Sequence, residues 1–261
     1  MIKDNIKIAP DSCNMSDTIS PIPVVDLDRI GLHRKPEEID KEALETVSVL
    51  LKTTFCQFGV CYFKNHGIGE DFMDKYMAIS KGFFNHPVEV KSQYLRGTRR
   101  DFGYTPMEKE TVNFDRPADL KEAFTYQPAY DPDDLLDKKF QNVCKEMYAL
   151  CTTLGYRVLD ALSLALGQRQ TFLRDCHKCI ATTTNGTTLK TLNYPLNPAT
   201  NAIKPGQVRL GEHSDFGTLT FLFQDDVGSG DQLSRQGIHT CNSYTWNYCG
   251  TCRRLTSALD R

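Results

Sequence analysis

Apolar residues recur at three- and four-residue steps in three long segments of the chain, which predicts three helices. The first begins after Asp40, a residue suited to cap a helix N-terminus, and ends before Phe58 and Gly59. The second covers residues 70–84, and the third and longest covers about residues 134–166. The stripe of the longest helix consists of Phe140, Val143, Cys144, Met147, Cys151, Leu154, Val158 and Leu162. We interpret it as a core-facing surface, which requires no cofactor to explain it.

Short segments rich in β-branched and aromatic residues predict strands. Two of them, residues 23–26 and 60–63, lie in the first quarter of the chain. Two more, residues 188–194 and 218–223, follow the longest helix and are separated by turn residues. Helices followed by short antiparallel strands are typical of an α+β fold whose strands form a double-stranded jelly roll with flanking helices.

The motif His213-Ser214-Asp215 directly precedes the last of these strands. Side chains two residues apart on an extended segment point to the same side, so His213 and Asp215 can face one metal ion. An imidazole and a carboxylate are two of the three ligands of a facial iron site, which leaves positions open for oxygen and a co-substrate. The same short pattern also occurs in exposed turns, so the surrounding sequence has to decide between the two interpretations.

Five blocks occur in order around this motif: PIPVVD at 21–26, FGVCYFKNHGI at 58–68, DLKEAF at 119–124, LNYP at 192–195 and GEHSDFGTLT at 211–220. Together they resemble the 2-oxoglutarate/Fe(II) dioxygenases of the isopenicillin N synthase-like branch. The resemblance extends over about residues 20–228. It implies a jelly-roll barrel that holds iron at its mouth, with helices packed outside.

The resemblance also implies a chemistry and its residues. Fe(II) would be the cofactor, bound by His213 and Asp215, and 2-oxoglutarate the co-substrate. Tyr194 would contact 2-oxoglutarate through its hydroxyl, although a core tyrosine is an alternative interpretation. Phe124 would lie near the substrate mouth. Oxidative decarboxylation of 2-oxoglutarate by molecular oxygen would then drive hydroxylation or desaturation of a small organic molecule.

Other residues of the blocks are interpreted as structural. His66 is expected to close a strand into a glycine turn. Lys121 and Glu122 are expected to form a structural ion pair or a loop tether. None of the three is therefore predicted to bind iron.

A complete site of this family also needs a second histidine, some fifty to sixty residues after the first pair, and then an Arg-x-Ser that grips 2-oxoglutarate. Among the 261 residues only His239 follows Asp215, and it comes too early. We therefore expect a jelly roll whose C-terminal strands are incomplete and a polypeptide without activity. Back-translating residues 237–260 and reading one base later permits strings that resemble the missing blocks, including Pro-Gly-Thr and Gly-Asp-Leu-Leu. This predicts a reading-frame shift between about residues 228 and 237.

These observations divide the chain into four parts. Residues 1–20 are polar and unpatterned and are expected to be a mobile leader. Residues 21–135 would be the N-terminal dioxygenase region, and residues 136–228 the long helix with a partial jelly roll. Residues 229–261 would be an aberrant, out-of-frame tail.

Composition narrows the classes of partner. A net charge of -2 with both signs interspersed offers no basic stripe for nucleic acid and no polybasic membrane anchor. The first residues lack the apolar core of a signal peptide, and no stretch approaches the ~18 apolar residues of a membrane span, so a cytoplasmic protein is expected.

The ten cysteines are scattered, and a reducing compartment would keep them as thiols. Two C-x-x-C pairs, Cys176 with Cys179 and Cys249 with Cys252, have the spacing of zinc ligands. Three classes of function therefore stay open: an oxygenase or its incomplete remnant, a catalytically dead binding or regulatory isoform, and a thiol-zinc protein. The ordered blocks favour the first.

Overall fold

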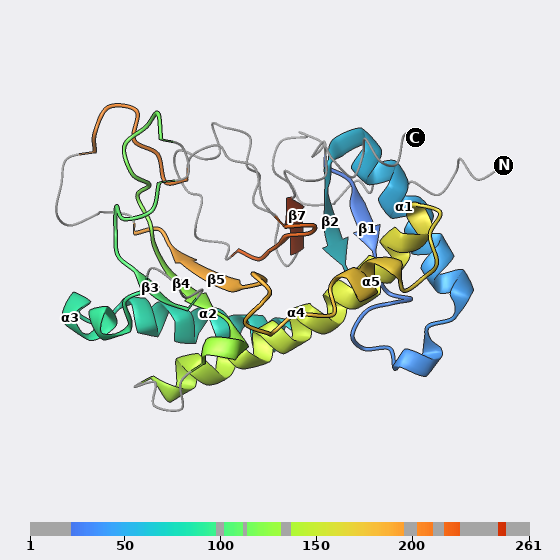
Figure 1. The fold of residues 1–261 in the computed structure, drawn as a ribbon, viewed down its shortest axis with the longest axis horizontal. Helices are drawn as coiled ribbons and strands as arrows, with labels where there is room; N and C mark the ends of the chain where they lie inside the picture. The colour runs from blue at the N-terminus through green and yellow to red at the C-terminus, as the bar shows by residue number, and fades with distance from the viewer. Residues whose placement is uncertain are drawn as a thin grey trace, which may run out of the picture. The chain divides into compact units, whose positions relative to one another are not determined.

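The computed structural model describes residues 22–97, 102–111, 114–131, 137–195, 203–210, 217–224 and, for the backbone, 245–248. These residues form two compact units, each with its own sheet (Figure 1). The described residues of the first unit are 22–67, 160–170, 217–224 and 245–248. Those of the second unit are 68–97, 102–111, 114–131, 137–159, 171–195 and 203–210.

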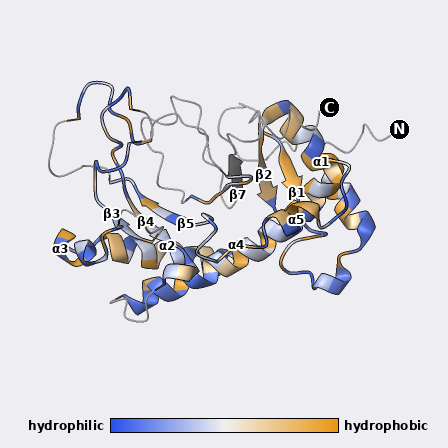
Figure 2. Cartoon of the chain, viewed as in Figure 1, coloured by the Kyte–Doolittle hydropathy of each residue, from blue (hydrophilic) through white to orange (hydrophobic). Residues whose placement is uncertain are grey.

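The first unit contains a four-stranded sheet in the order β1-β2-β7-β6. Its strands are β1 (Val24–Asp26), β2 (Val60–Lys64), β6 (Phe221–Leu222) and β7 (Thr245–Tyr248). β1 runs parallel to β2, and β7 pairs antiparallel with both β2 and β6. Helix α1 (Lys41–Phe58) contacts β1 and β2, whose hydrophobic character is visible in Figure 2.

Helix α1 begins where the sequence pattern predicts, after Asp40, and ends at Phe58, one residue later than predicted. The backbone N–H of Ala43 donates to the Asp40 carboxylate at 2.7 Å, which satisfies one of the free amides of the first turn. Gly59 ends the helix in the left-handed region, with φ of 71°. A short 3-10 turn, η1 (Pro36–Glu38), precedes it.

The turn after β2 lies against the turn after β1. Leu32 N–H donates to the carbonyl of His66 at 2.9 Å, and Gly67 has φ of +84°. A Cβ added at Gly67 would lie 2.6 Å from the nitrogen of Leu32, and one added at Gly31 would lie 2.3 Å from the carbonyl oxygen of Asn65. Gly67, the second glycine of the FGVCYFKNHGI block, is thus required by its backbone conformation and by the close approach of Leu32.

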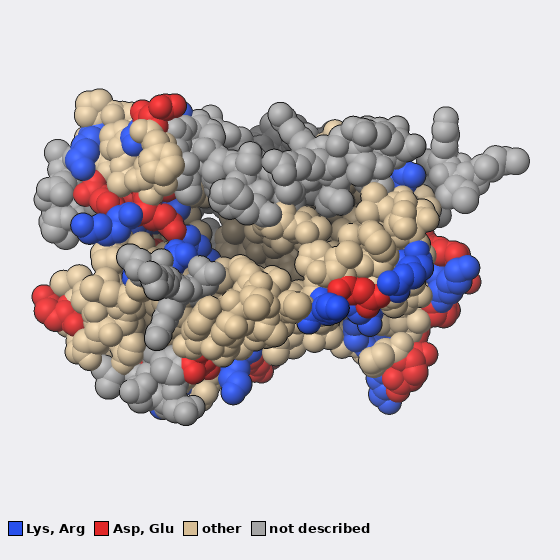
Figure 3. Space-filling view, in the orientation of Figure 1, with Lys and Arg blue, Asp and Glu red and all other residues tan. Residues whose placement is uncertain are grey.

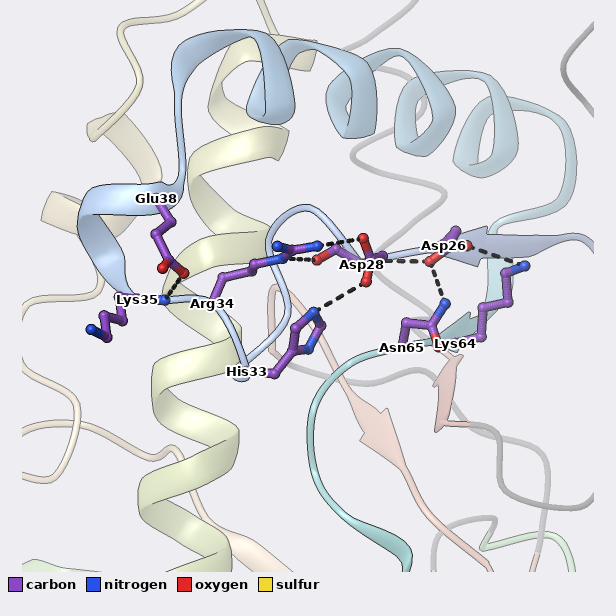
Figure 4. Close-up of polar contacts among 8 residues, drawn as sticks. All are labelled: Asp26, Asp28, His33, Arg34, Lys35, Glu38, Lys64 and Asn65. Atoms are coloured by element: carbon purple, nitrogen blue, oxygen red, sulfur yellow. Dashed lines mark hydrogen bonds and ion pairs between the residues drawn. The ribbon is translucent and has the colours of Figure 1, made fainter.

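Polar contacts fix the same pair of turns (Figure 4). The Asp26 carboxylate accepts hydrogen bonds from the Asn65 amide and from the backbone N–H of Asp28, each at 2.9 Å, and pairs with Lys64 at 3.1 Å. Arg34 donates to the side chain of Asp28 at 2.8 Å. The contacts of Asp26 therefore join the end of β1 to Lys64 and Asn65, and the Arg34–Asp28 bond lies within the turn after β1.

The second unit has a three-stranded antiparallel sheet in the order β3-β4-β5. Its strands are β3 (Gly103–Thr105), β4 (Glu122–Tyr126) and β5 (Leu189–Asn193). Its helices and 3-10 turns are α2 (Glu70–Phe84), α3 (Val88–Lys91), η2 (Ser92–Tyr94), η3 (Pro128–Tyr130), α5 (Phe172–Cys176) and the larger part of α4 (Lys138–Ala165), which continues into the first unit.

Aromatic rings fill the core of the second unit. Phe83 of α2 stacks on Phe140 of α4 with centroids 4.3 Å apart, and Phe124 of β4 contacts both rings edge-on. The hydroxyls of Tyr76 and Thr191 lie 2.6 Å apart and join α2 to β5. The predicted stripe of α4 is confirmed: seven of its eight residues are buried, and Cys151 is half-buried.

The strands differ from expectation near the C-terminus. The segment predicted over 218–223 forms only the two-residue strand β6. β7 lies within 229–261, where the pattern alternates poorly and predicts no strand, because pairing to β2 and β6 supplies its hydrogen bonds without any need for alternation. The described residues form a mixed helix-and-sheet structure, and the jelly roll stays a prediction. Among the described residues, no helix is both long enough and apolar enough to span a membrane.

Candidate functional site

The two predicted iron ligands, His213 and Asp215, lie outside the described residues. The nearest described residues on either side of the pair are Leu210 and Gly217. The geometry of the candidate site therefore comes from Tyr194 and from the segment 203–210, which leads toward the ligand pair.

Tyr194 directly follows β5, whose pairing with β4 fixes its position. Asn193 is opposite Glu122 in the antiparallel register, so the next position sets Tyr194 opposite Lys121. One residue further, Leu120 N–H donates to the carbonyl of Val208 at 3.0 Å. The residues just before β4 thus neighbour both Tyr194 and the segment 203–210, which precedes His213. Both neighbours lie about 70 to 90 residues further along the sequence.

The phenol of Tyr194 is held in its neutral form. Burial raises its pKa, the carboxylates of Asp119 and Glu110 raise it further, and Arg209 acts in the opposite direction. Those couplings also put Arg209, four residues before His213, within electrostatic range of the phenol. A neutral hydroxyl can donate a hydrogen bond to a carboxylate ligand.

A cluster of charges surrounds this position. Lys121 Nζ lies 3.0 Å from Asp119 Oδ2 and 3.2 Å from Glu110 Oε2, and its side chain is only 3% exposed. Lys190 of β5 pairs with the other oxygen of Glu110, and Arg96 lies 3.7 Å from it. Burial acts to raise the pKa of Glu110, but Lys190 and Lys121 lower it by more, so Glu110 is an anion.

The segment 203–210 is tied to the same region. Gln207 Nε2 donates to the carbonyl of Ala118 at 2.8 Å and to Glu108 Oε1 at 2.5 Å. Lys204 pairs with the same oxygen of Glu108 at 3.3 Å. With the Leu120–Val208 backbone bond, these contacts hold the segment that precedes the predicted ligands.

A second buried ion pair holds the end of β5. Glu122 Oε2 pairs with Lys91 Nζ at 2.7 Å and accepts a short hydrogen bond from the Tyr104 hydroxyl, while Oε1 accepts from the Asn193 amide at 2.9 Å. Burial and this carboxylate raise the pKa of Tyr104. Lys91 also donates to the carbonyl of Phe84 at 2.8 Å. Glu122 therefore ties β5, β3 and α3 together beside Tyr194.

Several sequence predictions can be compared with these contacts. Lys121 and Glu122 are tethers, as predicted, but they pair with different partners and not with each other. Phe124 is 1% exposed, and its contacts among the described residues are those of a core side chain. His66 is buried and contacts the ring of Phe223 edge-on with centroids 6.2 Å apart, which agrees with a structural role.

No sequence pattern indicated Glu110, Lys190, Lys91 or Arg209 as part of the site. Glu110 and Lys190 are 80 residues apart, and Lys91 and Glu122 are 31 apart. Ion pairs over such separations have no fixed spacing, so no local pattern could indicate them. The one available signal was the acid-base alternation of the DLKEAF block.

The first C-x-x-C pair lies away from these charges. Cys176 and Cys179 are both exposed, and across the described ranges no three His, Cys, Asp or Glu side chains are grouped to hold a metal. Cys249 and Cys252 lie outside those ranges. On the face seen in Figure 3, basic and acidic side chains lie mixed together where charged residues gather.

The chain is similar to known proteins along most of its length. The N-terminal family of the non-haem dioxygenases in morphine synthesis matches residues 22–154. The 2-oxoglutarate-dependent dioxygenase frbA of Dothideomycetidae sp. is 29% identical over 200 residues, 68% of this chain and 57% of that protein. The 2-oxoglutarate-Fe(II) type oxidoreductase ppzD of Metarhizium rileyi is 29% identical over 191 residues, 65% of this chain and 52% of that protein.

The fold is also similar to that of solved structures. A full-length Neurospora crassa protein, crystallised in complex with alpha-KG, superposes with a TM-score of 0.64 at 23% identity, over 88% of this chain and 73% of that one. The chain spans a little over half the length of the two curated relatives. Because the matching family segment covers just over half of the 261 residues, the chain belongs to the 2-oxoglutarate/Fe(II) non-haem dioxygenases.

Proposed function

We propose that this chain carries part of a dioxygenase that hydroxylates or desaturates a small organic molecule, with Fe(II) as cofactor, 2-oxoglutarate as co-substrate and molecular oxygen as oxidant. His213 and Asp215 would bind the iron, and Tyr194 would donate its hydroxyl to 2-oxoglutarate. The observation that supports this assignment is that Tyr194 and the segment 203–210 both neighbour the backbone just before β4.

The charges near Tyr194 suit a dianionic co-substrate. The carboxylates of Asp119 and Glu110 are matched by Lys121 and Lys190, and Arg96 and Arg209 add positive charge. The phenol itself stays protonated, so it offers a donor and no repulsion. When bound, iron would supply the oxidising chemistry from molecular oxygen and 2-oxoglutarate, and the protein would orient these groups and exclude water.

We further propose that these 261 residues alone do not turn over 2-oxoglutarate. They contain two of the three iron ligands and no Arg-x-Ser after Asp215, so the ion would stay largely solvated. Incubation with Fe(II) and 2-oxoglutarate should give no succinate above a metal-free blank. Succinate that disappears in His213→Ala would overturn the proposed inactivity and would support the dioxygenase site.

The dioxygenase assignment is tested on the protein expressed from a gene in which the predicted frame shift after the codon for Gly228 has been corrected. Turnover should require iron and should be lost in His213→Ala and Asp215→Ala, while His33→Ala, which removes an exposed partner of Asp28, should keep it. Thymine belongs in the substrate panel because the Neurospora crassa protein was also crystallised with it. Turnover that persists in His213→Ala or in Asp215→Ala would refute the assignment.

Tyr194 is tested separately. Tyr194→Phe should raise the KM for 2-oxoglutarate about 10- to 100-fold, the cost of a lost hydrogen bond to a charged group. Tyr130→Phe, which removes a hydroxyl bonded to the carbonyl of Thr183, should leave KM unchanged. An unchanged KM in Tyr194→Phe would show that Tyr194 is a core tyrosine.

A further inference from the structure

The connection between α5 and β5 carries two exposed thiols. Cys176 is the last residue of α5, and Cys179 lies in the turn that follows. Among the other cysteines in the described ranges, Cys61 and Cys144 are buried, and Cys56 and Cys151 are half-buried. Burial also raises the pKa of Cys61 and Cys144, which disfavours their thiolates. Among the cysteines of the described ranges, Cys176 and Cys179 are therefore the ones that reagents in solution reach most readily.

The backbone brings the two thiols onto one face. Backbone bonds run through this segment: His177 N–H donates to Arg174 O at 3.0 Å and to Leu173 O at 3.1 Å, and Ile180 N–H donates to His177 O at 3.1 Å. The segment therefore turns as the end of a helix does, with about three to four residues per turn, and side chains three apart lie on the same face. The two Cα atoms are then about 6 Å apart, within the range of about 4.4–6.8 Å that a disulfide spans.

The local charge favours an anionic disulfide as the reaction partner. Within residues 174–179, the two basic residues Arg174 and Lys178 outnumber the one acid, Asp175, and Lys178 is exposed. Arg174 lies over the ring of Tyr156, 5.8 Å from its centroid, and the Tyr156 hydroxyl donates to the carbonyl of His177 at 3.4 Å. These contacts fix the turn while leaving both sulfurs accessible.

We propose that Cys176 and Cys179 form a redox-active dithiol that closes to an intramolecular disulfide by exchange with a small anionic disulfide such as glutathione disulfide. One thiolate attacks the small disulfide, forming a mixed disulfide and releasing one glutathione thiolate, which takes up a proton. The second cysteine loses its proton, attacks the mixed disulfide and releases the second glutathione. The protein loses two electrons and two protons, and the small disulfide gains both.

Trypsin offers a direct test because Lys178 lies between the two cysteines. Cleavage after Arg174, Lys178 and Lys190 gives peptides 175–178 and 179–190, which only a disulfide can join. The full chain is equilibrated in glutathione disulfide, its remaining thiols are blocked with a maleimide, and the digest is analysed by mass spectrometry. The joined pair should become the main form of both peptides and should disappear after reduction with dithiothreitol.

Serine variants distinguish this reaction from ordinary surface thiol chemistry. In Cys176→Ser and Cys179→Ser the remaining cysteine should retain one glutathione, because no second thiol resolves the mixed disulfide. Cys56→Ser, which removes a half-buried thiol elsewhere, should leave the joined pair intact. Separate glutathione adducts on both cysteines of the unaltered chain, bonds to other cysteines or persistence of both free thiols would each overturn the proposal.

Discussion

Glu122 and Asn193 are opposite each other across β4 and β5, and the Asn193 side-chain amide donates to the Glu122 carboxylate at 2.9 Å. The same carboxylate pairs with Lys91 at 2.7 Å, and both charged side chains are 8% exposed. Asn193 directly precedes Tyr194, so this buried pair fixes the end of the strand on which the proposed co-substrate contact depends.

Replacing Glu122 by Gln should destabilise the protein by about 3–5 kcal/mol, because the buried Lys91 ammonium loses its counter-ion. The measurement is the free energy of unfolding in urea. Glu42→Gln is the matched control: Glu42 pairs with Arg29 at 3.3 Å but is 81% exposed, so its loss should cost below about 1 kcal/mol. Equal losses in the two variants would contradict the expected importance of the buried pair.

Gly67→Ala should also destabilise the protein, by more than about 1 kcal/mol, because its backbone has φ of +84° and a Cβ would meet Leu32 N at 2.6 Å. Gly82→Ala should do the opposite. Gly82 lies inside α2 with no atom within 4 Å of an added Cβ, so alanine should stabilise the helix by about 0.5–1 kcal/mol. The same sign for both variants in thermal unfolding would refute this contrast.

Stability should fall as the pH rises above about 10, where tyrosines of the unfolded chain ionise. Burial raises the pKa of Tyr76 well above this value, so the folded state keeps a proton that the unfolded state releases. Its contribution is complete below about pH 10 and is lost as the pH rises toward the folded pKa. Urea midpoints between pH 8 and 11 should fall less steeply in Tyr76→Phe, and an identical slope would exclude this cause.

His66 should give the reverse dependence on the acid side. Burial lowers its pKa, so its contribution is complete above the unfolded value of about 6.5 and is lost as the pH falls below it. His66→Phe keeps a ring against Phe223 but cannot titrate. The drop in Tm between pH 7.5 and pH 5.5 should be smaller in that variant, and an equal drop would point to other groups.

The nucleotide sequence tests the expected frame shift. Deleting one base, or adding two, shortly after the codon for Gly228 should replace the cysteine-rich tail with the Pro-Gly-Thr and Gly-Asp-Leu-Leu strings. The corrected frame should then contain a histidine followed by Arg-x-Ser. A stop codon before any histidine would show that the tail has another origin.

Local physics made the helices readable from the sequence alone. The Asp40 cap, the Gly59 stop and the stripe of α4 depend on residues within one or two turns of each other, so their spacing carries the information. The order of the five blocks, including the His213-Ser214-Asp215 motif, likewise identified the dioxygenase family without any coordinates.

Only the tertiary structure decided which charges meet and which side chains are covered. The pairs Lys91–Glu122 and Glu110–Lys190 form because antiparallel register and loop packing bring distant residues together, and no local spacing encodes that. Phe124, which the resemblance places near the substrate mouth, is buried by packing against Phe83 and Phe140, and no local pattern indicates those two partners. β7 exists through its pairing with β2 and β6, since hydrogen bonds to neighbouring strands can form where the side-chain pattern is uninformative.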